Sequence, residues 1–508
     1  MPYNTFMSSA QFKHQQNLSP AKQNIDLSKV TRSQSQASTI SNETADSLYD
    51  RSSLLIYAID SCLNNTIDDQ IKTIKPSYFH NFLPFKRYNN TQPPSSNESE
   101  EIKDGVTVSI TKRKLIERVT CEGLQDQILS NILLHTYKWY FTEVEMFTMF
   151  LERFKMSLPF CLSASERRGY IENRLSCVQL KVLNFLKQWI QHYSYILENS
   201  SEDKEIILEF VFLMASHLDV SSESRLLLSE IFSLIKNQEI DFPPFQTERK
   251  RGPRVTSLCE FFIELPHILD HAHFIAKQLC ILDAENISQV TTHEVFKKAW
   301  TSSDKKLKAP NLTLIAESST RLSRFVSYLI LMNKKNSLRI MTFEYLLGLC
   351  DKLIRLRNYN SAYAIYLGVT SPAVHRLSNL IEKNIGREYK EIFCHLHKFF
   401  STTNKSELFR KRQNEAPGPS VPHVGMYLGD ICFLEELPDF LDKEKRRINI
   451  KKFHALSKTL PYILNHKESY GFQKVENIYN FLKDLPSISE EKIYELSFKI
   501  QNKTACCC

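Results

Sequence analysis

Scarcity of glycine is the feature that most restricts the fold of this chain. Its 508 residues include 11 glycines, about 2%, whereas globular proteins usually contain about 7%. Phosphate-binding loops, dinucleotide folds and turn-rich β architectures all consume glycine, because glycine adopts unusual backbone conformations at little steric cost. The sequence contains neither GxxxxGK[ST] nor GxGxxG. We therefore predict an all-α protein, and its length predicts at least two folded units.

Charge, cysteine and histidine patterns exclude several other classes. The net charge of +8 is mild for this length, and no basic stripe interleaved with aromatics indicates a nucleic-acid site. Apart from the last three residues, the cysteines are scattered singly, without a CxxC pair. The two His-x-His pairs have no evident third ligand, so we expect no metal and no cofactor. Without an apolar leader or a run of about 18 apolar residues, the expected compartment is the cytoplasm.

Changes in composition divide the chain into five segments. Residues 1–101 are rich in Ser, Asn, Gln and Thr, and we predict that they are mostly disordered because they bury too little apolar surface. Helical periodicity predicts an N-terminal helical domain at 102–235. Residues 236–256 carry three prolines and a glycine and are predicted to be a linker. Residues 257–503 form a second helical block, and 504–508 a cysteine-rich tail.

Two patterns indicate helices in the first block. Thr142 and Glu145 have the spacing of a capping box ahead of an apolar run. Further along, apolar residues recur at helical spacing and predict a buried stripe, consisting of Val182, Leu183, Leu186, Trp189, Ile190 and Tyr193.

The segment Gly425 to Glu436 predicts a helix with two unlike faces. One stripe is apolar and comprises Val424, Tyr427, Leu428 and Ile431. The other is small and ends in a carboxylate; it comprises Gly425, Gly429, Cys432 and Glu436. Two glycines within one helix cost roughly 1 kcal/mol each relative to alanine, so they indicate close approach by another backbone. We predict that this second face enters another molecule.

Several motifs, in a shared order along both helical blocks, carry a family resemblance. These segments are Leu133–Tyr137, Leu151–Phe154, Val182–Trp189, Ile275–Leu279, Phe296–Trp300, Ala309–Leu312, Arg357–Ser361, Pro372–Leu377, Glu435-Glu436, Pro438–Leu441, Phe481–Pro486, Ser489–Glu491 and Tyr494-Glu495. In them the chain resembles the Ras-type guanine-nucleotide exchange factors, and 102–235 resembles their Ras exchanger motif domain.

The resemblance implies two helical domains, the C-terminal one (257–503) a helical bowl with a protruding hairpin at about 422–465. In the family this hairpin opens the nucleotide site of a Ras-subfamily GTPase (Ras-, Rap- or Ral-like) and accelerates GDP release without covalent chemistry. Residues matching the family's catalytic positions are Glu436, Gly429 and Cys432. Residues matching its GTPase-binding positions are Leu314, Ile315, Cys350, Asn358, Asn360, Phe409, His423 and Phe433. The second arm is predicted to begin at Asn449 and to bury Ile450, Phe453, Leu456 and Leu460.

Plainer interpretations stay open for these residues. Glu436 also fits an ordinary solvated helix residue, Cys432 simple packing and Asn360 a helix cap, and the apolar binding positions fit core packing. Two positions depart from the family: Cys432 replaces a bulkier side chain, and His423 an aromatic or apolar one. For the whole chain, the alternatives are a GTPase-binding scaffold without exchange activity and an unrelated helical adaptor.

The chain ends with Cys506, Cys507 and Cys508, which do not form a C-a-a-X box. Terminal cysteine clusters can be lipidated, and two lipid chains anchor a protein where one does not. The tail therefore suggests peripheral attachment to the plasma membrane or an internal membrane, with an unmodified thiol tail as the alternative.

Overall fold

The computed structural model describes a large part of the chain. The described residues are 56, 59, 63, 99–121, 126–156, 163–194, 201–217, 220–237, 271–401, 407–414, 418–442, 446–465 and 468–500. The predicted linker, apart from its first two residues, and the predicted cysteine-rich tail lie outside them, as does most of the segment predicted to be disordered. Within that segment, Ile56, Ile59 and Leu63 are helical and Ile59 is fully buried.

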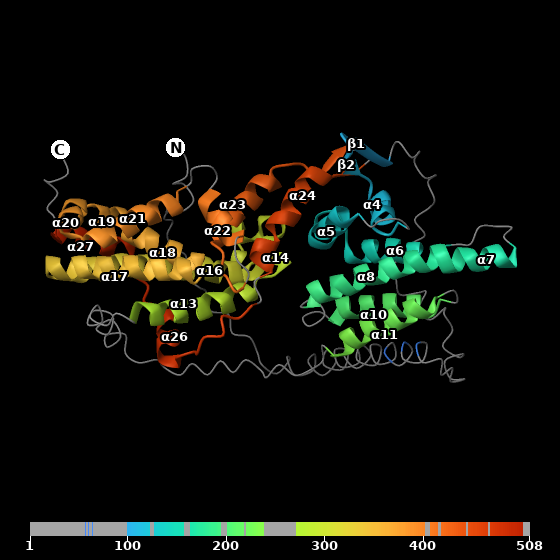
Figure 1. The fold of residues 1–508 in the computed structure, drawn as a ribbon, viewed down its shortest axis with the longest axis horizontal. Helices are drawn as coiled ribbons and strands as arrows, with labels where there is room; N and C mark the ends of the chain where they lie inside the picture. Colours follow the sequence, from blue (N-terminus) through green and yellow to red (C-terminus); the bar gives the residue numbers. More distant parts are fainter. Residues whose placement is uncertain are drawn as a thin grey trace, which may run out of the picture.

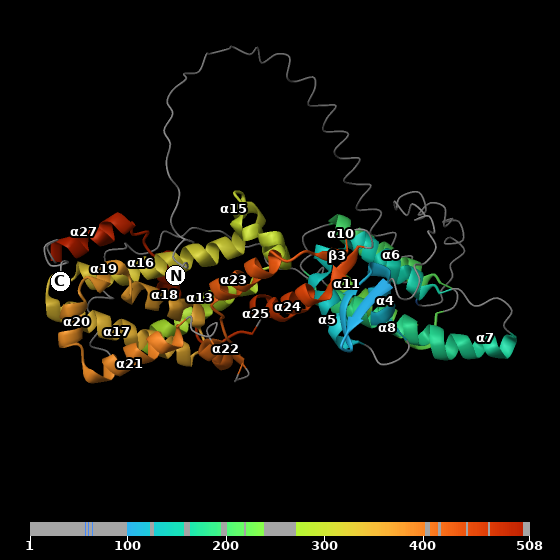
Figure 2. The ribbon, with the colours of Figure 1, turned by 90° about the horizontal axis from the view of Figure 1, so that it is seen from above.

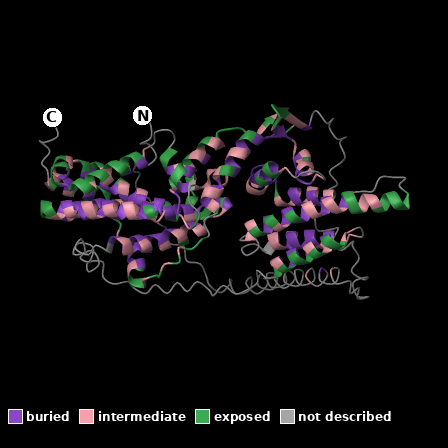
Figure 3. Cartoon of the chain, in the orientation of Figure 1, coloured by how far each residue is buried: buried purple, intermediate pink, exposed green. Residues whose placement is uncertain are grey.

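The N-terminal domain is a group of helices preceded by a β-hairpin (Figure 1). Strand β1 begins inside the segment predicted to be disordered, so the folded domain starts slightly earlier than predicted. The elements are β1 (Glu100–Lys103), β2 (Val106–Ile110), α4 (Lys112–Val119), α5 (Gln127–Thr136), the 3₁₀ helix η2 (Tyr137–Trp139), α6 (Glu143–Phe154), α7 (Ala164–Tyr170), the π-helix η3 (Ile171–Leu175), α8 (Ser176–His192), α10 (Ser201–Ala215) and α11 (Ser222–Asn237). Helix α7 buries none of its residues and is largely green in Figure 3.

Both patterns predicted in this domain lie in helices. All six residues of the predicted apolar stripe are buried in or just after α8. Thr142 caps α6, and its hydroxyl accepts a hydrogen bond from the Glu145 backbone N–H at 3.2 Å. The second half of the predicted capping box is wrong, because the Glu145 carboxylate pairs with Lys112 Nζ at 2.7 Å instead. A cation on α4 has replaced the backbone donor as its partner.

The C-terminal domain is built around the long helices α16 (Pro310–Met332) and α17 (Asn336–Arg355), which both pack on α18 (Tyr359–Val369). The other elements are α13 (His271–Ser288), α14 (Thr292–Val295), the 3₁₀ helix η5 (Phe296–Thr301), α15 (Lys305–Lys308), α19 (Pro372–His375), α20 (Ser378–Asn384), α21 (Arg387–Phe399), α22 (Glu407–Asn414), α23 (Val424–Glu435), β3 (Phe440–Asp442), β4 (Arg447–Asn449), α24 (Ile450–Thr459), α25 (Pro461–Leu464), α26 (Glu476–Lys483) and α27 (Glu490–Ile500).

Close packing between α16 and α18 depends on Gly368. A Cβ at this position would lie 2.6 Å from the Ser323 carbonyl oxygen and 2.5 Å from Val326 Cγ1. Both separations are far shorter than van der Waals contact, so any larger residue would force the two helices apart. This glycine is therefore structural, because it allows α16 and α18 to pack closely.

Helices α23 and α24 form the predicted hairpin, and the second arm reaches the N-terminal domain. Helix α24 packs on α5, and Figure 2 shows α24 and α25 lying between the two domains. The loop joining the arms contains β3 and β4, which extend the N-terminal β-hairpin into one antiparallel sheet of order β1-β2-β4-β3. Sequence analysis did not predict this small sheet. Helices nevertheless dominate the described residues, as the all-α prediction requires.

Pairing of β2 with β4 fastens the end of the hairpin to the N-terminal domain. Ile110 lies opposite Ile448, and both side chains are fully buried. Helix α24 begins directly after β4, with Asn449 as its cap and Ile450, Phe453, Leu456 and Leu460 buried as predicted. The second arm is thus held at its start by a sheet contributed by both domains.

Among the described residues, the longest helices are not apolar enough to cross a bilayer.

Candidate functional site on the helical hairpin

Helix α23 shows the two faces that the sequence predicted. Val424, Tyr427 and Ile431 are buried and Leu428 is partly buried. On the other side Gly429 is exposed, and a Cβ built there would meet nothing within 4 Å. Nothing within the described protein therefore requires glycine at this position.

The other residues of this face are also accessible. Glu436 is exposed and Cys432 is half-buried. Burial raises the pKa of the Cys432 thiol, which keeps it protonated at neutral pH. Phe433 adds a large apolar side chain that is 73% exposed. The predicted catalytic face thus opens to solvent and is not sealed within its own domain.

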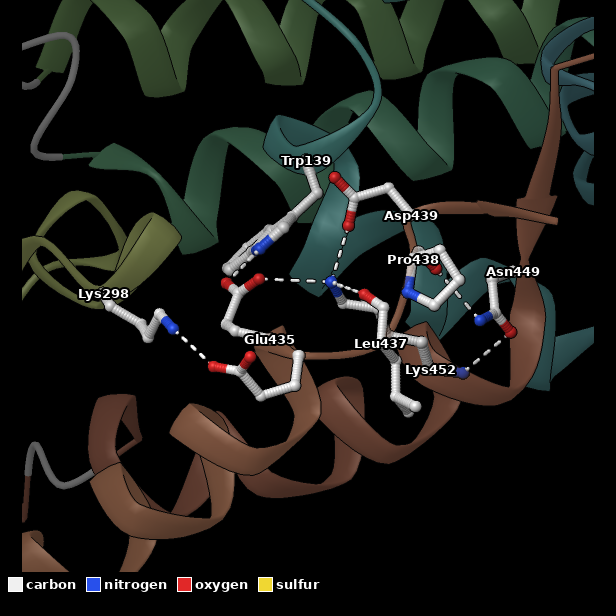
Figure 4. A network of polar contacts seen from close by, with 9 residues as sticks. Trp139, Lys298, Glu435, Leu437, Pro438, Asp439, Asn449 and Lys452 are labelled. Atoms are coloured by element: carbon white, nitrogen blue, oxygen red, sulfur yellow. Dashed lines mark hydrogen bonds and ion pairs between the residues drawn. The ribbon is translucent and has the colours of Figure 1, made fainter. Parts of the chain in front are cut away.

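Glu435, the residue before Glu436, has the opposite environment. Its side chain is 7% exposed, Trp139 Nε1 donates a hydrogen bond to Oε1 at 2.6 Å, and Lys452 Nζ donates to Oε2 at 3.2 Å. Figure 4 shows Trp139 and Lys452 gathered around this carboxylate. Because Trp139 belongs to the N-terminal domain, Glu435 joins the tip of α23 to both α24 and that domain.

Lys452 is the centre of this buried network. Its side chain is 1% exposed, and besides Glu435 its ammonium group donates to Asp439 Oδ1 at 2.6 Å and to the Leu437 carbonyl at 2.8 Å. Asn449 closes the loop by donating to the Pro438 carbonyl at 3.0 Å. A buried ammonium needs such partners, since burying an unpaired charge is strongly unfavourable. The network thereby fixes the turn between the two arms.

Glu436 points its charge toward solvent and toward one cation. Its side chain is 71% exposed, and Lys298 Nζ lies 2.8 Å from Oε1. The hydrogen bond from Lys298 and the attraction of its charge hold the pKa of Glu436 below the usual range. An ionised, accessible carboxylate therefore stands at the end of α23.

Lys298 reaches Glu436 from a segment with unusual backbone. Lys297 and Lys298 both have positive φ, 46° and 58°, and left-handed backbone costs a non-glycine residue roughly 1–2 kcal/mol. Just before them, the Phe296 ring packs edge-on against Trp139 with centroids 5.1 Å apart. The segment is thus anchored on the N-terminal domain where it turns toward the hairpin.

His423 lies at the N-cap of α23 beside an aromatic cluster. Its ring centroid is 4.1 Å from that of Tyr363, and a Cβ on Gly425 would lie 3.1 Å from the His423 ring. This glycine therefore makes room for His423, a reason that sequence analysis did not consider. Burial lowers the pKa of His423 to about 4, so the ring is neutral at physiological pH.

Most of the predicted apolar binding residues are buried in the described structure. Ile315 is 6% exposed, Phe409 2% and Cys350 0%; the Cys350 thiol donates to the Ala362 carbonyl at 3.2 Å. Leu314, at 41%, and Phe433 are the exposed members of this group. For the buried ones, packing beneath the surface is the role that the geometry supports, and direct contact would require the surface to open.

The two asparagines also belong to the scaffold. Asn358 is fully buried; its Oδ1 caps α18 by accepting from the Ser361 N–H at 3.1 Å, and its Nδ2 donates to Asp283 Oδ2 at 2.9 Å. Asn360, 7% exposed, exchanges a hydrogen bond with Ser319. The helix-cap alternative considered for Asn360 therefore applies to Asn358, and for Asn358 a direct contact with a partner is not supported.

Sequence analysis missed the residues that support the hairpin tip, namely Trp139, Lys298, Glu435 as a buried group, and Lys452. No local pattern marks them, because each acts on a residue distant in sequence; Trp139 lies 296 residues from Glu435. The adjacent pair Glu435-Glu436 was visible, but a single sequence does not show which carboxylate is buried. Within the described ranges, no cluster of three or more His, Cys, Asp or Glu residues is arranged to hold a metal ion.

Comparison with known proteins agrees with this architecture. Residues 274–454 match the RasGEF domain and residues 106–213 match the RasGEF N-terminal motif. The chain therefore belongs to the Ras-type guanine-nucleotide exchange factor family. The first match ends within α24, so it contains both arms of the hairpin up to that point.

Curated relatives are similar at low identity. The chain is 26% identical over 421 residues to Ras guanine nucleotide exchange factor S of Dictyostelium discoideum, covering 79% of this chain and 38% of that protein. It is 23% identical over 430 residues to exchange factor A of the same organism, covering 80% and 68%. With Ras-specific guanine nucleotide-releasing factor 1 of Rattus norvegicus the identity is 25% over 327 residues, covering 64% and 26%. The chain thus spans only 38% of the first of these relatives.

Proposed function

We propose that this chain accelerates release of GDP from a Ras-subfamily small GTPase by inserting α23 into the nucleotide site. One observation carries the proposal: the outer face of α23 is open at Gly429, where a Cβ would meet no described atom within 4 Å, and it ends in the exposed carboxylate of Glu436. Membership of the exchange-factor family supports the same function.

Chemically, the exchange is a competition for the nucleotide site. A bound nucleotide is held by Mg²⁺, by a lysine and by backbone N–H groups around its phosphates. A carboxylate entering this site takes a hydroxyl that would otherwise bind Mg²⁺, and its charge repels the phosphates in a region of low dielectric. Glu436 is ionised, so it is ready for both tasks. No group of the exchange factor needs to act as nucleophile or base.

The buried network around Lys452 gives the hairpin the rigidity that such insertion requires. An inserted helix can open the nucleotide site of a partner only if bending that helix costs more free energy than displacing the partner's residues. Glu435 ties the end of α23 to Trp139 and to Lys452, and β4 is paired with β2. We infer that the N-terminal domain supports α23 while it is inserted.

Release of a fluorescent GDP analogue from purified GTPases tests the proposal. The full chain is added to Ras-, Rap- and Ral-type GTPases, each preloaded with the analogue, and the decay rate is recorded. We expect acceleration of at least one of them, and a loss of roughly tenfold or more for Glu436→Gln. Gly429→Glu, which fills the open face with a charged side chain, should abolish acceleration.

Glu391→Gln is the matched control. Glu391 is also 71% exposed and also pairs with a single basic residue, Arg387, at 3.4 Å, but it lies on α21, away from the hairpin. Its substitution should leave the rate unchanged. Equal losses for Glu391→Gln and Glu436→Gln would contradict a specific role for the hairpin tip.

The alternative is a scaffold of the same fold that binds a GTPase without ejecting its nucleotide. The burial of Cys350, Phe409 and Asn358 does not distinguish the two functions, because residues that pack beneath the surface support the fold in either case. Tight binding to a GTPase, measured by calorimetry, without faster nucleotide release would establish this alternative.

We further propose that the protein works in the cytoplasm at a membrane surface, through lipidation of Cys506, Cys507 and Cys508. The support is sequence alone, since two acyl chains suffice for stable anchoring. Replacement of all three cysteines by serine should shift the chain from the membrane to the soluble fraction of fractionated cells. An unchanged distribution would contradict this proposal.

A further inference from the structure

The contact between Lys298 and Glu436 joins two parts of the chain that are 138 residues apart. Lys298 lies on η5 and Glu436 caps the C-terminus of α23. The Nζ–Oε1 distance of 2.8 Å is that of a strong charge-assisted hydrogen bond. Among the described residues no other group donates to this carboxylate, so Lys298 alone sets its direction.

The backbone of η5 is shaped to make this contact. Two successive lysines, Lys297 and Lys298, lie in the left-handed region, which residues with a Cβ normally avoid. Such strained conformations persist only where the surrounding structure holds them. In a regular helical conformation the chain would follow a different path after Phe296, and Lys298 would no longer lie beside α23.

Both ends of the strained turn are anchored. On one side, Val295 is fully buried and the Phe296 ring contacts Trp139. On the other, η5 packs directly on α23, and Figure 4 shows Lys298 extending from its own segment toward the end of that helix. The segment that carries Lys298 is thus held by contacts with both domains, unlike a free loop.

We propose that Lys298 is a positioning residue, which fixes the Glu436 carboxylate in the direction required for entry into the nucleotide site before the GTPase arrives. This inference rests on the proposed function. A free glutamate side chain populates several rotamers, and ordering it during insertion would slow the reaction. The bond from Lys298 engages Oε1 and leaves Oε2 for a hydroxyl of the partner.

The pair differs from a stabilising surface ion pair in its expected effects. Its members are 35% and 71% exposed, and pairs of this kind contribute little to folding stability. Removal of Lys298 should therefore leave the melting temperature almost unchanged. A loss of exchange activity without a loss of stability is the signature of positioning.

Four variants of the full chain test the inference in the nucleotide-release assay. Lys298→Met, which keeps most of the length of the side chain and removes its charge, should lower kcat/KM roughly three- to tenfold. Lys298→Arg should restore most of the rate, because it again presents a cation to the carboxylate. Lys297→Met is the matched control and should leave kcat/KM unchanged. The ammonium group of Lys297 lies 5.1 Å from the Phe296 ring centroid and makes no contact with Glu436. Glu436→Gln combined with Lys298→Met should be no slower than Glu436→Gln alone.

Failure of this inference is distinguishable from failure of the proposed function. If the wild-type chain accelerates no GTPase, the proposed function fails and this inference falls with it. If the wild type is active and Lys298→Met is equally fast or faster, only the positioning role is overturned. The positioning role also fails if Lys298→Met causes its full loss in the Glu436→Gln background, since Lys298 then acts independently of the carboxylate.

Discussion

The two arms of the hairpin are built for opposite purposes. Helix α24 is packed on both domains, begins at a cap that is the last residue of strand β4, and contains a buried lysine with three partners. Helix α23 has a buried stripe but leaves Gly429 and Glu436 in the open. Stability is concentrated in one arm and accessibility in the other. The difference indicates that α24 holds the hairpin in place while α23 makes contact.

Lys452 gives the strongest test of whether α24 holds the hairpin in place. Lys452→Met leaves Glu435 and Asp439 buried or half-buried without their cation, and breaking a buried pair in this way costs about 3–5 kcal/mol. We expect a fall of that size in the free energy of unfolding, measured by denaturant titration, with faster hydrogen exchange in α24. Nucleotide release should fall as well, because α23 loses its support.

Lys458→Met is the control on the same arm. Lys458 is exposed on α24, so its replacement should change the unfolding free energy by a few tenths of a kcal/mol at most. Similar effects of the two substitutions would show that the buried network does not hold the hairpin.

A smaller effect is expected from the contact between domains. Trp139→Phe keeps the aromatic packing on Phe296 but removes the indole N–H that donates to Glu435 at 2.6 Å. Loss of a hydrogen bond to a charged group costs about 1.5–3 kcal/mol. Thermal unfolding should show this loss, and exchange activity should decline with it. Unchanged stability and activity would mean that the N-terminal domain does not brace the tip through this residue.

His423 offers a pH-dependent comparison between the base of α23 and the rest of the chain. Its pKa is lowered to about 4 in the folded protein, whereas an unfolded histidine titrates near 6.5. Between these values the unfolded chain binds more protons at this residue, so its contribution to stability falls as the pH drops from about 6.5 to about 4.

The variant His423→Phe should therefore lose less stability than wild type over that pH interval. The measurement is the melting temperature of both proteins at several pH values between about 7 and about 4.5, and the difference between them isolates this residue from other titrating groups. Parallel curves would contradict the burial of a neutral ring at the base of α23.

How much of this arrangement the sequence revealed depends on the range of the interaction. The faces of α23, the cap at Asn449 and the stripe on α8 follow from local periodicity, and the structure confirms them. The sheet that joins the domains could not be predicted, because its strands are three to five residues long and lie far apart in the chain. The same holds for Lys452 and Lys298, whose partners are brought to them only by the fold.

The GTPase-binding residues were predicted through resemblance alone, and the structure separates those that support the fold from those that lie on the surface. Asn358 matches a binding position, yet it is fully buried and caps α18. A motif reports that a residue type is needed at a position. It does not report whether the need is for packing or for contact, since both act through the same side chain.

The smallest effect, and the sharpest test of the comparison, is expected at Gly429. Because a Cβ there meets nothing within 4 Å, Gly429→Ala should stabilise α23 by about 0.5–1 kcal/mol through lower backbone entropy in the unfolded chain. The same methyl group would stand where we propose that the GTPase approaches, so nucleotide release should slow.

Gly348→Ala is the matched control, since Gly348 lies inside α17 and a Cβ there makes only ordinary contact, 3.9 Å from Tyr389. It should give a similar gain in stability with unchanged exchange. If Gly429→Ala gains stability without losing activity, the open face of α23 is not the surface that enters the partner, because a gain and a loss together are what an exposed functional glycine requires.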